Sequence, residues 1–150
     1  MPFDEFPVER SLTITRILPA SRQAVFDAWT DEASVRQWMC PEGVSVAQAT
    51  LDVRVGGAFR VDMLINGERL AHTGHYREVE PPERLAFTWI SKDTRQRDTL
   101  VTITLVALSD NSTELRLTQT LLPDDDSVRD HTQGWTEILE HLASTLGGQA

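Results

Sequence analysis

The stretch DDDSVRDHTQGWTEILEHLASTLGG, residues Asp124–Gly148, is typical of one long amphipathic helix. Its acidic start suits the positive end of a helix dipole, Ser127 and Asp130 have the spacing of a capping box, and the double glycine suits its end. Mostly apolar side chains recur at three- and four-residue spacing, which predicts one buried stripe. The stripe consists of Val128, Thr132, Trp135, Leu139, Leu142 and Leu146. We therefore predict a helix from about Asp126 to Leu146 that packs on the rest of the domain through this stripe.

Six strand-like runs precede this helix, between residues 44 and 121. Tight-turn dipeptides separate several of them, at Gly56-Gly57, Asn66-Gly67 and Asp110-Asn111. The first of the six, Val44–Val55, is expected to end at the double glycine. Six consecutive strands joined by short turns predict an antiparallel meander.

A further strand and two short helices come before the meander. Apolar residues of one parity mark the strand at Leu12–Leu18. Ser21 is suited to begin the first helix, and Thr30 or Asp31 to begin the second, because short oxygen-bearing side chains cap helix N-termini. The second helix is expected to end near Trp38, shortly before a proline.

This order of elements predicts an α+β domain. One helix of about five to six turns must cover one face of the sheet, because each element buries its apolar side against another layer. A curved sheet gripping a single helix leaves space between them, since a rod cannot fill a trough along its whole length. We assign residues 11–150 to this single domain and residues 1–10 to an N-terminal extension.

The segment HTGHYREVEPPERLAFTWI, His72–Ile90, predicts an aromatic hairpin inside the sheet. A four-residue loop at its double proline pairs Val79 with Arg84. Counting back from that pair places Tyr76 opposite Phe87, on one side of the sheet. The hairpin closes either over a filled core or over a cavity, and we expect core at the turn and cavity toward the other end.

Polar atoms favour the cavity interpretation at that end. The Tyr76 hydroxyl, the Trp89 indole N–H and the His72 imidazole all need partners if they are buried. An apolar chamber with a few polar groups is typical of a small-molecule site. The predicted ligand-binding residues are Trp38, Phe59, Met63, His72, Tyr76, Phe87, Trp89, Trp135 and Leu139. The two short helices are expected to form a lid at one end of this chamber.

No motif in the sequence predicts catalysis, a metal or another cofactor. His72 and His75 point to opposite faces of their strand, and His131 and His141 lie nearly three helical turns apart, so no pair has metal-ligand spacing. Cys40 is the only cysteine and is expected to be an unreactive free thiol. We assign no catalytic residue, metal ligand or cofactor.

Composition excludes two classes of partner. The formal net charge of −9 opposes binding to nucleic acid, which is a polyanion. No apolar stretch approaches the roughly 18 to 20 residues that a membrane span requires. The first ten residues lack the basic and apolar regions of a secretory signal, and the lone cysteine fits a reducing compartment. A cytoplasmic location is therefore expected.

Four motifs resemble one protein family in order and interval. They are RQWMCPEG at 36–43, LDVRVGGAFR at 51–60, GHYREVEPPERLAFTW at 74–89 and HTQGWTEILEHLASTL at 131–146. Together they are similar to the activators of heat-shock protein 90 ATPase homologues, within the START-like, polyketide-cyclase-like SRPBCC superfamily. The resemblance covers roughly residues 11 to 147, although Cys40 stands where that family commonly has glycine. It implies the helix-grip (START/Bet v-like) fold.

Three classes of function are open on these observations. The first is non-catalytic binding of a small hydrophobic or aromatic molecule in the cavity between sheet and helix. The second, implied by the resemblance, is a chaperone-linked stress-response or protein-interaction role, with a chaperone or a second copy of the chain as partner. The third is a cyclase- or hydrolase-type enzyme that uses His72 or Tyr76 as general acid or base.

Overall fold

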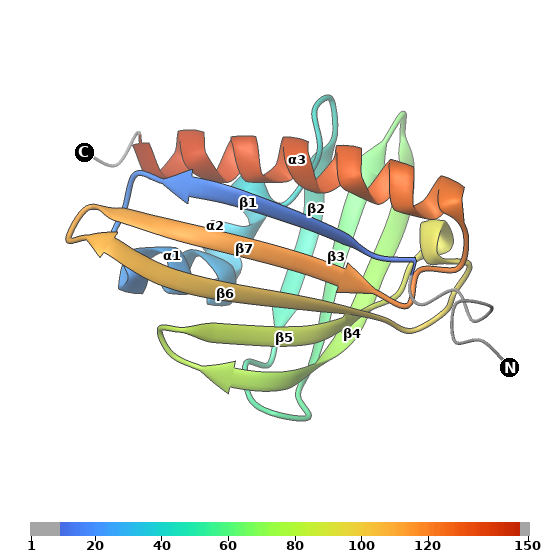
Figure 1. The fold of residues 1–150 in the computed structure, drawn as a ribbon. Helices are drawn as coiled ribbons and strands as arrows, with labels where there is room; N and C mark the ends of the chain where they lie inside the picture. Colours follow the sequence, from blue (N-terminus) through green and yellow to red (C-terminus); the bar gives the residue numbers. More distant parts are fainter. Residues whose placement is uncertain (1–9, 148–150) are drawn as a thin grey trace, which may run out of the picture.

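The computed structural model of the protein describes residues 10–147, whose strands form one antiparallel sheet (Figure 1). The sheet order is β1-β7-β6-β5-β4-β3-β2, so β2 to β7 are a meander and β1 adds to the edge at β7. The strands are β1 (Leu12–Leu18), β2 (Ser45–Leu51), β3 (Ala58–Ile65), β4 (Glu68–Glu80), β5 (Arg84–Trp89), β6 (Thr99–Ser109) and β7 (Ser112–Thr120). This confirms the predicted meander.

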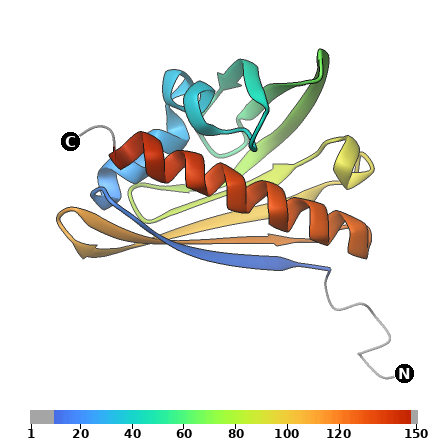
Figure 2. The ribbon, with the colours of Figure 1, turned by 90° about the horizontal axis from the view of Figure 1, so that it is seen from above.

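Helices lie on one side of the curved sheet. They are α1 (Arg22–Thr30), α2 (Glu32–Trp38), the short 3₁₀ helix η2 (Lys92–Thr94) and α3 (Asp125–Gly147). Viewed from above, α1 and α2 lie toward the C-terminal half of α3 and η2 lies beside its N-terminal part (Figure 2). The α+β, helix-grip arrangement is thus confirmed. Residues 1–9 of the predicted extension and residues 148–150 lie outside the described part of the chain.

The two short helices begin where their capping residues predict. The Ser21 hydroxyl accepts a hydrogen bond from the Ala24 N–H at 3.1 Å, and the Asp31 carboxylate accepts one from the Ser34 N–H at 3.0 Å. Each bond satisfies a backbone donor that the first helical turn leaves free. Among residues 10–147, no helix is long and apolar enough to cross a membrane.

The start of α3 differs from the predicted capping box. Asp124 accepts the Ser127 N–H at 2.8 Å, so the cap is Asp124 and the box at Ser127 and Asp130 is wrong. The Ser127 hydroxyl instead donates to the backbone carbonyl of Asp93 in η2, at 2.8 Å. Since this bond runs between two elements, the local spacing of residues did not predict it.

The buried stripe of α3 also begins differently. Thr132 is exposed and Val128 is only partly buried, so the predicted stripe is wrong in its first turns. The observed buried residues are Ser127, His131, Trp135, Ile138, Leu139, Leu142 and Leu146. Ser127 and His131 tolerate burial because their polar atoms form hydrogen bonds there. The helix therefore presents a polar segment to the sheet where apolar residues were expected.

The hairpin of β4 and β5 has the predicted register over only part of its length. Tyr76 lies opposite Phe87 as expected, but Val79 pairs with Leu85 instead of Arg84. The loop is one residue shorter than predicted, which changes the partner of Val79. A register shift between Tyr76 and Glu78 then compensates for the missing residue and restores the predicted pairing at Tyr76. The aromatic pair therefore faces the same side of the sheet as expected.

The turn between β2 and β3 is wider than predicted. β2 ends at Leu51 instead of Val55, because the Asp52 N–H bonds the Ala58 carbonyl at 3.1 Å and the chain then leaves the sheet. Within this turn the Arg54 guanidinium lies 2.9 Å from the Asp52 carboxylate, and both side chains are exposed. The pair is thus a surface ion pair beside the glycine turn.

Candidate ligand-binding site

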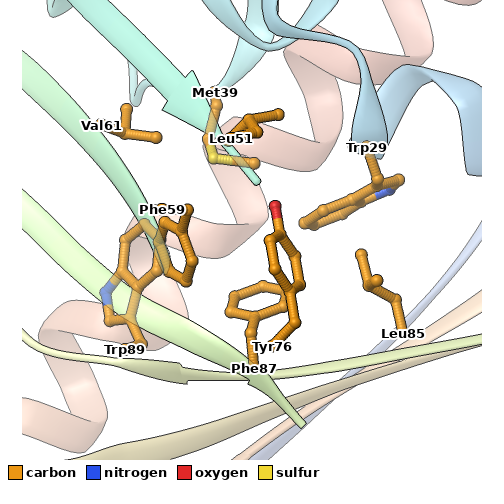
Figure 3. Close-up of a pocket in the computed structure, with 9 residues that line it drawn as sticks. All are labelled: Trp29, Met39, Leu51, Phe59, Val61, Tyr76, Leu85, Phe87 and Trp89. Atoms are coloured by element: carbon orange, nitrogen blue, oxygen red, sulfur yellow. The ribbon is translucent and has the colours of Figure 1, made fainter. Parts of the chain in front are cut away.

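The aromatic side chains of the hairpin close over an interior space that is almost filled (Figure 3). The cavity between them has a volume of about 10 Å³, counted as space open to the centre of a water-sized sphere. That is room for about one water molecule, whereas ligand pockets typically hold about 300 to 1,000 Å³. Its walls are Trp29, Met39, Leu51, Phe59, Val61, Tyr76, Leu85, Phe87 and Trp89. At this end the hairpin closes over a packed core.

Close ring contacts explain why this interior is filled. Phe59 and Phe87 meet edge to face with centroids 5.3 Å apart, and the Tyr76 ring lies 5.6 Å from Phe59. The Tyr76 hydroxyl points toward Met39 and Leu51, beside the edge of the Trp29 ring (Figure 3). Trp29 comes from α1. Burial raises the pKa of Tyr76 well above its ordinary value, so the hydroxyl stays protonated. The short helices thus fill their end of the trough.

A second space opens between the sheet and the N-terminal half of α3. Its volume is about 100 Å³ on the same measure, ten times that of the interior cavity. Strands β3, β4 and β5, helix η2 and helix α3 all contribute to it. Its lining residues are Pro41, Met63, Ile65, His72, Trp89, Asp93, Asp130, His131, Gly134, Trp135 and Ile138. We call this space the η2-side pocket.

His72 is a buried polar group without a partner in this pocket. Its side chain comes from β4, the residue is 7% exposed, and its Nδ1 forms no hydrogen bond within the described chain. Burial lowers the pKa of His72, against the opposing effects of nearby backbone carbonyls of Val61 and Leu70 and of the Asp93 carboxylate. The ring is therefore neutral at pH 7 and offers one acceptor nitrogen.

His131 lies in the same pocket in a defined tautomer. Its Nδ1 is 2.8 Å from the backbone carbonyl of Ser127, one turn earlier in α3. Because a carbonyl oxygen only accepts, Nδ1 must carry the proton and donate. In the neutral ring the acceptor is then Nε2, the nitrogen on the other side.

A chain of buried hydrogen bonds holds the aromatic wall of the pocket. The Trp135 indole N–H donates to the Gln119 side-chain oxygen at 2.8 Å. The amide nitrogen of Gln119 in turn donates to Thr99 Oγ1 at 2.9 Å. The Thr99 hydroxyl donates to the Trp89 backbone carbonyl at 2.6 Å. The ring centroids of Trp89 and Trp135 lie 5.0 Å apart, and the two ring planes are inclined by 52°. This network fixes the wall in one arrangement without any ligand.

The nine predicted ligand-binding residues divide into four groups. Phe59, Tyr76 and Phe87 line the interior cavity, while Met63, His72 and Trp135 line the η2-side pocket. Trp89 lines both spaces. Trp38 and Leu139 line neither space: both are fully buried in the core, where the Trp38 indole N–H donates to the Ala28 carbonyl at 3.2 Å. His72 and Tyr76, the two predicted polar groups, therefore lie in separate spaces.

Three polar pocket residues were not predicted: Asp93, Asp130 and His131. A signal for His131 was present, because it precedes Trp135 by one helical turn and so shares its face. No such signal existed for Asp93, since nothing in the sequence predicted η2. Gln119 likewise has the inward parity of Leu117 on β7, and parity alone would have predicted its burial.

Metal-ligating side chains and the Cys40 thiol do not form a second candidate site within the described residues. Within residues 10–147, no group of three or more His, Cys, Asp or Glu side chains is arranged to hold a metal ion. Burial raises the pKa of Cys40, which is the opposite of what an activated thiolate requires.

Comparison with known proteins connects this structure to one family. The model of the family described as "Activator of Hsp90 ATPase homolog 1-like protein" matches residues 19–147. A solved structure from Chromobacterium violaceum is 30% identical, covers 91% of this chain and 96% of its own, and has a TM-score of 0.81. An AHSA1 protein from Silicibacter pomeroyi is 29% identical and has a TM-score of 0.82. The match covers 93% of this chain and 99% of that protein.

A more distant structure shows the shared fold. It is described as an Hsp90 activator from Plasmodium falciparum, is 23% identical, covers 91% of this chain and 96% of its own, and has a TM-score of 0.74. No curated protein matches the chain. The family match spans most of the sheet and all three α-helices, so the chain belongs to the family of Activator of Hsp90 ATPase homolog 1-like proteins.

Proposed function

We propose that this protein binds a small, largely apolar or aromatic molecule in the η2-side pocket, without catalysing a reaction on it. The observation that carries the proposal is an open pocket with apolar walls that is also lined by the polar ring of His72. Apolar walls with a few polar groups are typical of small-molecule sites, and a polar atom of the ligand beside the His72 ring would fix its orientation.

The size of the pocket limits the ligand. A dry cavity of about 150 Å³ accepts benzene, so a pocket of about 100 Å³ with an open mouth suits a single ring or a short alkyl chain. Trp89 and Trp135 offer ring faces, and Met63 offers an adaptable thioether. Any larger part of the ligand must project into solvent.

The predicted binding residues take different parts in this proposal. Met63, His72, Trp89 and Trp135 contact the ligand directly. The others, Trp38, Phe59, Tyr76, Phe87 and Leu139, support these four from within the core and reach a ligand only if sheet and helix separate.

Binding of benzyl alcohol, a neutral single-ring probe, tests the proposal. We expect a Kd below about 1 mM, equivalent to about −4 kcal/mol. Met63→Trp should abolish this binding by filling the pocket. Leu64→Trp is the matched control, because Leu64 is the neighbouring, partly exposed residue on the other face of β3, and it should bind like the parent protein. If Met63→Trp still binds benzyl alcohol, or if the parent protein does not bind it, the proposal is wrong.

A chaperone-linked role is the second candidate, and the family match supports it. The proposed partner is a chaperone of the Hsp90 class. The decisive assay is the ATPase rate of such a chaperone with and without equimolar protein. An unchanged rate, together with no co-purification, counts against this role.

A further inference from the structure

We infer that the ligand of the η2-side pocket carries a cationic amine, which the mouth of the pocket recognises through Asp93 and Asp130. The inference rests on the proposed binding function and adds the chemical class of the ligand. Three features of the described residues support it: the charge of the mouth, the acceptors inside, and the aromatic wall.

The mouth of the pocket is acidic and contains no compensating cation. Asp93 from η2 and Asp130 from α3 both line it and are exposed, and the lining includes neither lysine nor arginine. Asp93 forms no ion pair within residues 10–147, and Asp130 pairs only with the exposed Arg129, at 3.3 Å. Exposed pairs of that kind contribute at most about 1 kcal/mol. Both carboxylates are therefore available to an incoming charge.

Inside the mouth the unsatisfied polar groups include acceptors. The neutral His72 ring has one acceptor nitrogen and makes no hydrogen bond through its buried Nδ1. In the neutral form of His131, Nε2 is the acceptor, because Nδ1 donates to the Ser127 carbonyl. An ammonium group has three donors and no acceptor, so it complements two carboxylates and two imidazole nitrogens. A carboxylate or phosphate ligand would be repelled by the two carboxylates at the mouth.

The tryptophan wall and the overall charge favour the same ligand class. Cations are attracted to tryptophan rings within about 6 Å of the ring centre, and Trp89 and Trp135 both line the pocket. A net charge of −9 also raises the local concentration of cations around the protein. The fitting ligand is thus an amine attached to a ring or a short apolar chain.

Paired titrations with benzylamine and benzyl alcohol test the inference, because the two probes share a ring and differ in charge. At low ionic strength and pH 7.5 we expect benzylamine to bind at least about tenfold more tightly. The double variant Asp93→Asn/Asp130→Asn should abolish this preference, so that both probes bind it with a similar Kd. The matched control is Asp126→Asn, an exposed carboxylate on α3 outside the pocket lining, and it should keep most of the preference.

The outcomes separate the inference from the function beneath it. If benzyl alcohol binds and benzylamine binds no better, the amine inference is wrong and the binding function stands. If neither probe binds, both fail. If Asp126→Asn lowers the preference as much as the double variant does, net charge is responsible and the assigned carboxylates are wrong.

Discussion

The interior cavity and the η2-side pocket share Trp89, yet one is filled and the other is open. In the interior, Phe87 meets both Phe59 and Tyr76 edge to face, and the three rings leave room for about one water. On the η2 side, the wall opposite the rings is made by polar residues of α3 and η2. Aromatic content alone therefore does not create a cavity; the facing residues decide it.

Trp135→Ala should produce the largest loss of stability. Trp135 is 2% exposed, and truncating a buried aromatic side chain costs about 3 to 5 kcal/mol. The Gln119 oxygen also loses its donor. Chemical denaturation measures the change, with Thr132→Ala, an exposed site on the same helix, as control. An unshifted midpoint for Trp135→Ala would contradict the placement of α3.

Gly74→Ala should produce the next largest loss of stability, because the interior around Gly74 is tightly packed. A Cβ at position 74 would collide with the Thr88 carbonyl and press on the Phe59 ring. Overpacking of this kind typically costs about 1 to 3 kcal/mol, so we expect a clear drop in melting temperature. A variant as stable as the parent would show that the interior is looser than described.

Gly134→Ala is the matched change on the open side. Gly134 lies within α3 and lines the η2-side pocket, and a Cβ there would meet nothing within 4 Å. Alanine is favoured over glycine inside helices by up to about 1 kcal/mol, so this variant should gain stability. A loss of stability in the same thermal melt would mean that the pocket is closed at this position.

The smallest expected effect is the acid sensitivity that His72 contributes. Its folded-state pKa lies below the unfolded value near 6.5, so the unfolded chain binds more protons as the pH falls through that range. The destabilisation is absent well above the unfolded pKa and grows below it. His72→Phe should therefore lose less stability than the parent between pH 7.5 and 5.5. An equal loss in both proteins would contradict the neutral, buried state.

Periodicity and turn residues predicted most of the fold. The two short helices begin at Ser21 and Asp31 as expected, because capping depends on residues within one turn. The pairing of Tyr76 with Phe87 was also predicted, although through a loop length and a bulge that offset each other. These features depend on contacts between residues that are close in sequence.

The site was predicted less completely, for a physical reason. Ser127 becomes buried because the Asp93 carbonyl of η2 accepts its hydroxyl, and no local pattern predicts that contact. His131 becomes buried one turn later, where the Ser127 carbonyl of α3 accepts its Nδ1–H. His72 and His131 lie 59 positions apart and meet in one pocket only through the sheet curvature and the placement of α3. The aromatic residues were predicted by parity, but whether they leave space depends on the facing layer.

The indole N–H signals of the four tryptophans offer the most direct test of the central claim, that ligand binds in the η2-side pocket and not in the interior. In a ¹⁵N–¹H NMR titration with benzylamine, we predict that the Trp89 and Trp135 signals shift with one common Kd. The Trp29 and Trp38 signals, from residues outside that pocket, should stay in place. Shifts at Trp29 and Trp38 with Trp135 unchanged would place the ligand in the interior and contradict the account.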